Sequence, residues 1–185
     1  MTYSNVAAGG VIFASTINDL ILYGPGKPIC ELQQQAGQTI ASSTDTILTY
    51  GAGSEVYDDR NWHNTSVNTS RITPDIPGRY KVTVRVTFAF QFTVAGSNCY
   101  VSKNGTVYDR IGNIKHYNLA TSGTNPLTSN TATSCGEMVT YVDMNGTTDY
   151  LESGCSHNSN GAASQTTNVA ASGRTTFIVE LERAA

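Results

Sequence analysis

The sequence predicts an all-β fold, an antiparallel jelly-roll sandwich forming one domain. Three observations predict it: a long strand with alternating apolar and polar residues, many short segments separated by turn signals, and a composition low in charge. Only 14% of the 185 residues are charged, against about 25% in typical proteins. Thr, Ser, Asn, Gly and 10 Tyr fill this deficit, which suits pleated strands joined by turns.

The longest predicted strand covers residues 80–92. Its alternate positions are apolar: Tyr80, Val82, Val84, Val86, Phe88, Phe90 and Phe92. This period of two predicts one face on a core and one face toward solvent or a polar contact. Pro77 and Gly78 before it predict a type II turn in which Gly78 has a positive φ. Because a straight strand of this length is unusual, we expect a bend or bulge near Ala89.

Further strands are predicted at short intervals. Asn104-Gly105 predicts a tight hairpin within residues 97–112, because both turn positions need a positive φ. Asn145-Gly146 predicts a second hairpin within residues 135–155. Many short strands with turn signals about every 8–12 residues indicate a sandwich or jelly roll.

The charge and the lengths of the apolar runs argue against two classes of partner, nucleic acid and membrane. The net charge is −3, from 11 basic and 14 acidic residues, which gives no electrostatic reason to bind nucleic acid. No apolar run approaches the roughly 20 residues that span a bilayer, so no membrane insertion is expected. The first residues lack the pattern of a secretory signal, so we expect synthesis and assembly in the cytoplasm.

The four cysteines are Cys30, Cys99, Cys135 and Cys155. In a reducing cytoplasm, buried free thiols are favoured, and a single disulfide is the alternative. We expect Cys30, Cys99 and Cys155 to be reduced and to face the core, since each shares a strand face with apolar neighbours. The ligand spacings of structural zinc sites are missing.

The N-terminal segment, residues 1–27, differs from the rest. It ends in the sequence GPGKP, a natural hinge before the predicted jelly-roll domain of residues 28–185. The segment is either an arm or a part of the core. As an arm it would attach to another protein through its apolar residues, which are Val11, Ile12, Phe13, Ile17, Leu20 and Ile21.

No catalytic, metal-binding or cofactor-binding residues are predicted. Cys155 and His157 would share one strand face, but a Cys-His dyad usually draws its base from a distant segment, so a core cysteine and a loop histidine are expected. Asp58 and Asp59 supply too few oxygen ligands for calcium on their own, although trimer symmetry could multiply them.

The long segment 51–70 holds a candidate surface binding loop. Its residues are Tyr57, Asp58, Asp59, Trp62 and His63. Three of these, Tyr57, Trp62 and His63, could form an aromatic platform for a sugar, such as a host cell-surface glycan. The alternative, which we favour, is that Trp62 fills the core.

Four segments in order resemble the globular complement-1q and tumour-necrosis-factor-like jelly roll. They are ITPDIPGRYKVTVRVTFA, VSKNGTVYDR, MVTYVDMNGTTDYLES and TTFIVELERA. Upstream, QTIASSTDTILTYGAGSEVYDDRNWHN resembles small versions of this domain in tailed-bacteriophage virion proteins. The match covers roughly residues 28 to 184. It departs from the usual pattern at Asn145-Gly146, where Gly-Asp is common, and at Ile178, where Gly is common.

The resemblance implies a homotrimer in which one sheet faces its neighbours. Apolar residues on both faces of residues 138–144 agree with burial on two sides, one against the core and one against a partner. The wholly intramolecular sandwich is the alternative. The candidate interface residues are Met138, Tyr141, Val142 and Ile178.

The sequence therefore favours a non-enzymatic structural protein of a bacteriophage virion. A trimeric jelly roll would attach through its N-terminal arm to a capsid or tail protein, and the resemblance favours a minor tail or fibre-tip protein. The alternatives are a head decoration protein or head fibre on the capsid, and a lectin-like carbohydrate-binding module outside any virion.

Overall fold

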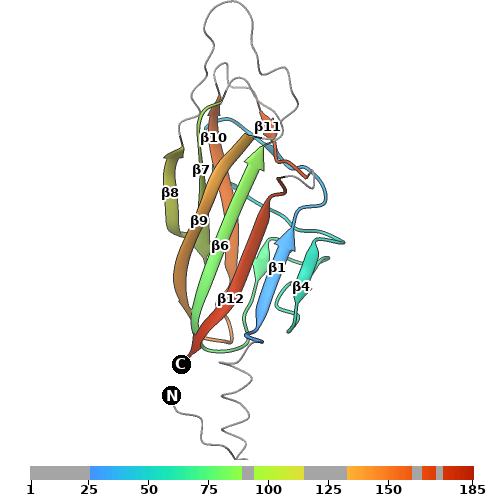
Figure 1. The fold of residues 1–185 in the computed structure, drawn as a ribbon, viewed down its shortest axis with the longest axis vertical. Helices are drawn as coiled ribbons and strands as arrows, with labels where there is room; N and C mark the ends of the chain where they lie inside the picture. Colours follow the sequence, from blue (N-terminus) through green and yellow to red (C-terminus); the bar gives the residue numbers. More distant parts are fainter. Residues whose placement is uncertain (1–25, 89–93, 115–132, 160–163, 170–172) are drawn as a thin grey trace, which may run out of the picture.

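The computed structural model describes residues 26–88, 94–114, 133–159, 164–169 and 173–185. Within these residues every regular element is a strand, and no helix is long and apolar enough to cross a bilayer. Two antiparallel sheets lie face to face (Figure 1). The sequence-based fold class, an antiparallel jelly-roll sandwich, is confirmed.

The front sheet of Figure 1 has five strands in the order β4-β1-β12-β6-β9. Their bounds are β4 (Glu55–Asp58), β1 (Ile29–Gln33), β12 (Thr176–Ala184), β6 (Gly78–Phe88) and β9 (Thr133–Met144). Strands far apart in the chain are neighbours here, since β1 pairs with β12 and β12 pairs with β6. Such pairing is typical of a jelly roll rather than of a row of hairpins.

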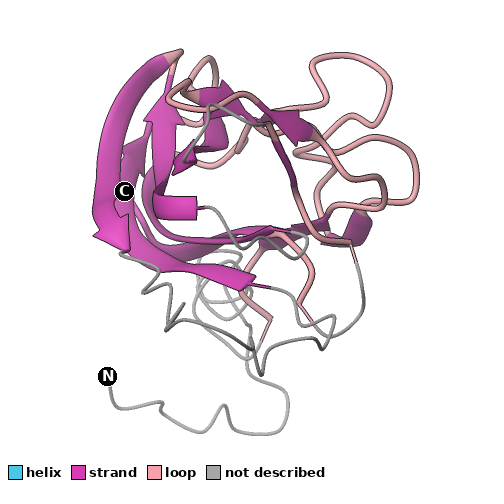
Figure 2. Cartoon of the chain, turned by 90° about the horizontal axis from the view of Figure 1, so that it is seen from above, coloured by secondary structure: helices cyan, strands magenta, loops and turns pink. Residues whose placement is uncertain are grey.

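The back sheet has the order β3-β10-β7-β8, and β5 pairs with β10 beside this row. Their bounds are β3 (Thr46–Ile47), β10 (Leu151–Ser159), β7 (Val94–Lys103), β8 (Thr106–Ile114) and β5 (Arg71–Ile72). A small third sheet pairs β11 (Gln165–Thr166) with β2 (Thr39–Ile40). Figure 2 shows the long loops on the side of the molecule away from β8 and β9.

Strand β6 has the alternation that the sequence predicts. Its inward side chains are fully or almost fully buried: Tyr80, Val82, Val84, Val86 and Phe88. The register between β6 and β9 shifts between Val86 and Thr87, so the described strand has its bulge there. The expected position near Ala89 lies outside the described residues.

The turn before β6 differs from the prediction. Gly78 is not among the glycines with a positive φ, so its role is not that of a type II turn glycine. It is the first residue of β6, and a Cβ on it would overlap the carbonyl oxygen of Arg183 on β12. Close approach of two backbones therefore explains this glycine.

One predicted hairpin is confirmed and the other is wrong. β7 and β8 pair through Asn104 and Gly105, whose φ values are 53° and 78°. β9 and β10, by contrast, lie in different sheets, because β9 pairs with β6 and β10 pairs with β7. The segment 145–150 crosses between the sheets, and its bend is held by the Asn145 side-chain oxygen, which accepts three backbone N–H groups.

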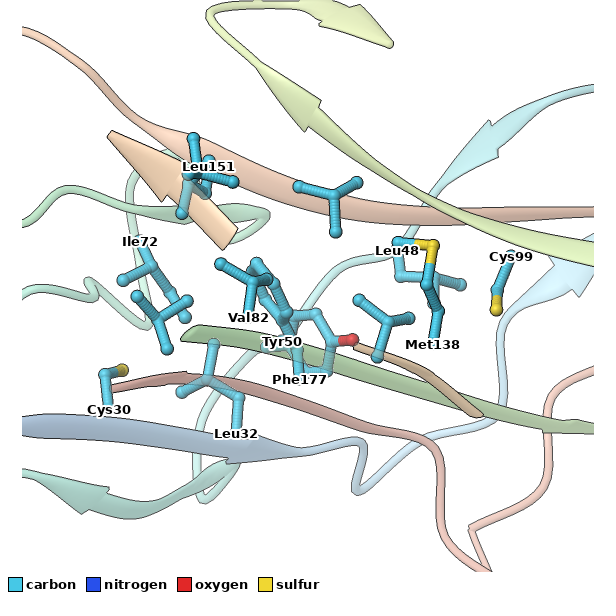
Figure 3. Packing of buried hydrophobic residues seen from close by; sticks show 14 of the residues in the cluster. Cys30, Leu32, Leu48, Tyr50, Ile72, Val82, Cys99, Met138, Leu151 and Phe177 are labelled. Atoms are coloured by element: carbon cyan, nitrogen blue, oxygen red, sulfur yellow. The ribbon is translucent and has the colours of Figure 1, made fainter. Parts of the chain in front are cut away.

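Buried side chains from both sheets and the loops form one core (Figure 3). Tyr50 stacks on Phe177 with ring centroids 6.1 Å apart, and its hydroxyl shares a 2.8 Å hydrogen bond with Ser153. Each fully buried apolar side chain contributes roughly 1.5–3 kcal/mol. The core is therefore the main source of stability for the described fold.

Cys30, Cys99 and Cys155 are buried free thiols in this core, as predicted. Burial raises the pKa of Cys155 to about 12 and raises the pKa of Cys30 as well, so both stay protonated at neutral pH. The predicted loop position of His157 is wrong. His157 lies within β10, is buried, and contacts the backbone oxygen of Ile40 through Nε2 at 2.9 Å.

Candidate functional site

A groove of about 320 Å³ opens between the loop 59–73 and the crossing segment 145–150. Its lining mixes apolar, amide, hydroxyl and cationic side chains, which are Trp62, Asn64, Val67, Asn68, Arg71, Thr73, Thr148 and Tyr150. The volume is at the lower end of the range for small-ligand sites. The groove is therefore large enough for a small polar ligand.

Trp62 forms the floor of the groove at the edge of the core. Its side chain is 3% exposed, and its ring meets Tyr80 edge-on with centroids 5.6 Å apart. The indole Nε1 donates to Asp75 Oδ1 at 2.7 Å, and the backbone N–H donates to Asp58 Oδ1 at 2.9 Å. The favoured prediction, a core tryptophan, is confirmed, and the same residue also lines the groove.

Asp75 fixes the Trp62 indole from the solvent side. Its carboxylate accepts Arg60 Nε at 2.7 Å and Arg60 Nη2 at 2.6 Å, a bidentate pair. The hydrogen bonds from Arg60 lower the pKa of Asp75 to about 2, with a further contribution from Trp62. The carboxylate therefore stays charged at neutral pH and keeps the indole in one orientation.

One wall of the groove is a stacked cation. The Arg71 guanidinium lies 3.9 Å from the centroid of the Tyr150 ring, and Arg71 Nε lies 3.4 Å from Glu152 Oε1. Glu152 is nearly buried and also accepts a 2.7 Å hydrogen bond from Ser70. These contacts restrict Arg71 to one position, with its charge offset by a fixed carboxylate.

The loop that carries Trp62 is tied down at several points. The backbone of His63 forms an antiparallel β-bridge with Ile72. The buried His63 ring contacts Glu55 Oε1 at 2.9 Å and the Thr69 backbone oxygen at 3.2 Å. Asp58 Oδ2 accepts the His63 backbone N–H at 2.9 Å. The loop therefore resembles a short hairpin that these hydrogen bonds hold in place.

The structure divides the predicted surface loop. Trp62 lines the groove, but Asp58 and His63 are structural partners within the loop, and neither is among the groove residues. Tyr57 and Asp59 are exposed on and just after β4. The predicted aromatic platform of Tyr57, Trp62 and His63 does not form, because Tyr57 is exposed and the other two are buried.

Sequence reasoning missed most of the groove. Asn64, Val67 and Asn68 belong to the same long segment 51–70, so its length was a valid signal for them. Tyr150 and Thr148 come from a segment that the sequence places in a hairpin turn. Only the crossing between the two sheets brings them to the loop.

A second surface lies on β8 and β9. β8 and β9 are the end strands of the two sheets and lie next to each other (Figure 1). Five exposed apolar side chains lie on these strands and are named the edge patch: Val107, Tyr108, Ile111, Val139 and Tyr141. The Tyr108 hydroxyl donates to the Tyr141 backbone oxygen at 3.3 Å, which joins the two strands.

The structure corrects two of the four predicted interface residues. Met138 and Val142 are 4% and 0% exposed in the single chain and belong to its core, so they have no surface to offer a partner. Tyr141 is 44% exposed on the other face of β9. Ile178 is half-buried on the outer side of β12. Tyr141 and Ile178 therefore remain predicted interface residues.

The predicted attachment residues Val11, Ile12, Phe13, Ile17, Leu20 and Ile21 lie outside the described residues. The arm of residues 1–27 and its boundary with the jelly roll stay predictions. Within the described residues, no group of three or more His, Cys, Asp or Glu side chains is placed to hold a metal ion.

Comparison of the sequence with protein-family profiles and with curated proteins finds no match. Among solved structures, murine APRIL at pH 8.0 is similar with a TM-score of 0.50 and 13% identity, over 83% of this chain and 98% of that one. Eiger TNF from S. frugiperda has a TM-score of 0.45 at 12% identity, over 86% of this chain and 95% of that one. The globular domain of zebrafish complement 1qA has a TM-score of 0.34 at 12% identity, over 86% and 100%.

The chain has the tumour-necrosis-factor-like jelly-roll fold. The first similarity and the strand order carry this assignment. At such low identity the likeness concerns the fold alone, and it transfers no receptor, ligand or assembly to this chain.

Proposed function

We propose that this chain is a non-enzymatic, homotrimeric structural protein of a bacteriophage particle. In the particle it is a minor tail or fibre-tip protein that attaches through its N-terminal arm and exposes the jelly roll. The phage context is supported by the resemblance of residues 38–64 to small versions of this jelly roll in tailed-bacteriophage virion proteins. The observation that carries the trimer is the edge patch.

The edge patch favours self-association for a physical reason. End strands with exposed Val, Ile and Tyr side chains are normally paired, covered or charged, because they otherwise promote aggregation. Tyr141 and Val139 lie on the outer face of the front sheet, and Arg79 lies 5.4 Å from the Tyr141 ring centroid. A closed symmetric oligomer covers such a patch on every copy, and we assign the occupant to a second copy of this chain.

The non-enzymatic part of the proposal is supported by the chemistry of the thiols. A nucleophilic cysteine needs a lowered pKa and access to solvent. Cys155 is buried with a raised pKa, so it lacks both properties. It is better suited to packing than to covalent catalysis.

Adjacent residues of β9 provide a test of the trimer. Wild type should have a mass of three times 19.7 kDa by light scattering. Tyr141→Asp should give a folded monomer, because Tyr141 is exposed in the single chain. Val142→Asp is the matched control, and it should unfold the chain because an unpaired charge in the core is costly. A wild-type monomer at micromolar concentration would contradict the trimer.

The virion role needs a separate test. Deletion of residues 1–24 should leave a folded trimer that no longer joins particles. Labelled protein should be seen at the tail in micrographs of particles. Label on the capsid would support the head decoration alternative instead, and a truncated protein that still joins particles would exclude the arm as the anchor.

A further inference from the structure

We propose that the groove between the loop 59–73 and the segment 145–150 binds a neutral saccharide unit. The proposal rests on the groove itself and holds whether or not the protein is part of a particle. It assigns a ligand class to a set of side chains that shares only Trp62 with the aromatic platform expected from the sequence.

The first argument is the balance of charge. Among the described residues that line the groove, Arg71 is the single cation, and none is acidic. The Arg71 charge is already offset by Glu152 at 3.4 Å and by the face of Tyr150. An anionic ligand would have to compete with this carboxylate, so the groove favours a ligand without net charge.

The second argument is the supply of hydrogen-bonding groups. Asn64 uses its side-chain oxygen for the N–H groups of Ser66 and Val67, and its amide nitrogen donates to no described residue. The Thr73 hydroxyl and the terminal nitrogens of Arg71 also have no hydrogen bond within the described part of the chain. Amides and hydroxyls that both donate and accept match the hydroxyl groups of a sugar.

The third argument is the apolar part of the lining. Val67 is 61% exposed, and Trp62 forms a floor that is fixed by Asp75 and Tyr80. A sugar ring presents C–H groups on one face and hydroxyls at its rim. An apolar patch beside uncharged polar groups accommodates both, and a fixed floor reduces the entropy lost on binding.

The test uses the full-length protein and saturation-transfer NMR. The probes are the methyl glycosides of glucose, galactose, mannose and N-acetylglucosamine, with methyl glucuronide and inorganic phosphate as anionic comparators. At least one neutral glycoside should bind, at millimolar or tighter affinity. Failure of all four neutral glycosides in a folded sample would overturn the proposal, as would binding of the anionic probes alone.

Two variants locate the binding. Thr73→Tyr fills the groove and should weaken binding at least about tenfold, whereas Thr73→Val removes one hydroxyl and should weaken it less. Thr147→Val is the control, because Thr147 is exposed in the same crossing segment but does not line the groove. Binding that survives Thr73→Tyr unchanged would place the sugar elsewhere and refute the assignment. Neither variant alters the edge patch or the arm, so failure here leaves the trimer and virion proposals intact.

Discussion

The groove and the edge patch differ in how their side chains are held. Around the groove, Trp62, Asp75 and Arg71 are each fixed by two or more named partners. On the edge patch, Val107 and Val139 are 44% and 49% exposed apolar side chains without polar groups to anchor them. A preorganised polar site can bind a small ligand as it stands, whereas an exposed apolar strand edge becomes stable only when another protein covers it.

The largest effect on folding is expected from Trp62→Ala. This change removes a buried indole from both the core and the groove floor, and it should lower the free energy of unfolding by about 3–5 kcal/mol. Tyr57→Ala, from the same predicted loop, is the control, and it should change stability by less than about 0.5 kcal/mol because Tyr57 is mostly exposed. Urea denaturation measures the free energy of unfolding of both variants. Equal losses would contradict the finding that Trp62 belongs to the core whereas Tyr57 does not.

A smaller loss is expected from Gly154→Ala on β10. The Tyr100 ring lies directly over Gly154, so a Cβ there would overlap it. Arg110 covers the same ring at 4.7 Å from its centroid and pairs with Asp45, which limits how far Tyr100 can move. We expect a loss of about 1–3 kcal/mol from overpacking.

Gly51→Ala is the matched control for this change. A Cβ on Gly51 meets nothing within 4 Å, and its φ is not positive. Thermal unfolding of the two variants should therefore differ clearly. A neutral Gly154→Ala would show that the outer face of the back sheet is less tightly packed than its contacts indicate.

Asp75→Asn should have a modest effect that depends on pH. The folded-state pKa of Asp75 is about 2, below its usual value of 3.8, so its ion pair stabilises the fold above pH 4 and this contribution is lost as the pH falls toward 2. Because the pair is half-exposed, we expect roughly 1 kcal/mol or less at neutral pH. The stability of the variant should therefore fall less steeply than that of the wild type between pH 4 and pH 2. An acid-unfolding profile identical to the wild type would contradict the role of Asp75.

The smallest effect on folding is expected from Val139→Thr on the edge patch. The side chain is exposed and keeps its β-branched shape, so the stability of the single chain should change by less than about 0.5 kcal/mol. Self-association should nevertheless weaken, which sedimentation over a range of concentrations measures. A variant that loses stability but associates as well as the wild type would show that Val139 stabilises the single chain rather than an interface.

Much of the fold could be predicted because strand signals are local. The alternation of β6, the Asn104-Gly105 turn and the inward thiols each depend on residues close in sequence or on one strand face. The Asn145-Gly146 segment shows the limit of such signals. A turn motif indicates that the chain bends, but it does not indicate whether the next strand pairs with the previous one or crosses to another sheet.

The sequence by itself determined the class of fold, the burial of β6 and the two-sided apolar character of β9. Only the tertiary structure decided which face of β9 is core, because Met138, Val142 and Tyr141 are all compatible with either side until β6 and the back sheet are in place. The groove was decided in the same way. Arg71 and Tyr150 are distant in sequence, and they meet because β5 pairs with the start of β10, a long-range contact that no local pattern encodes.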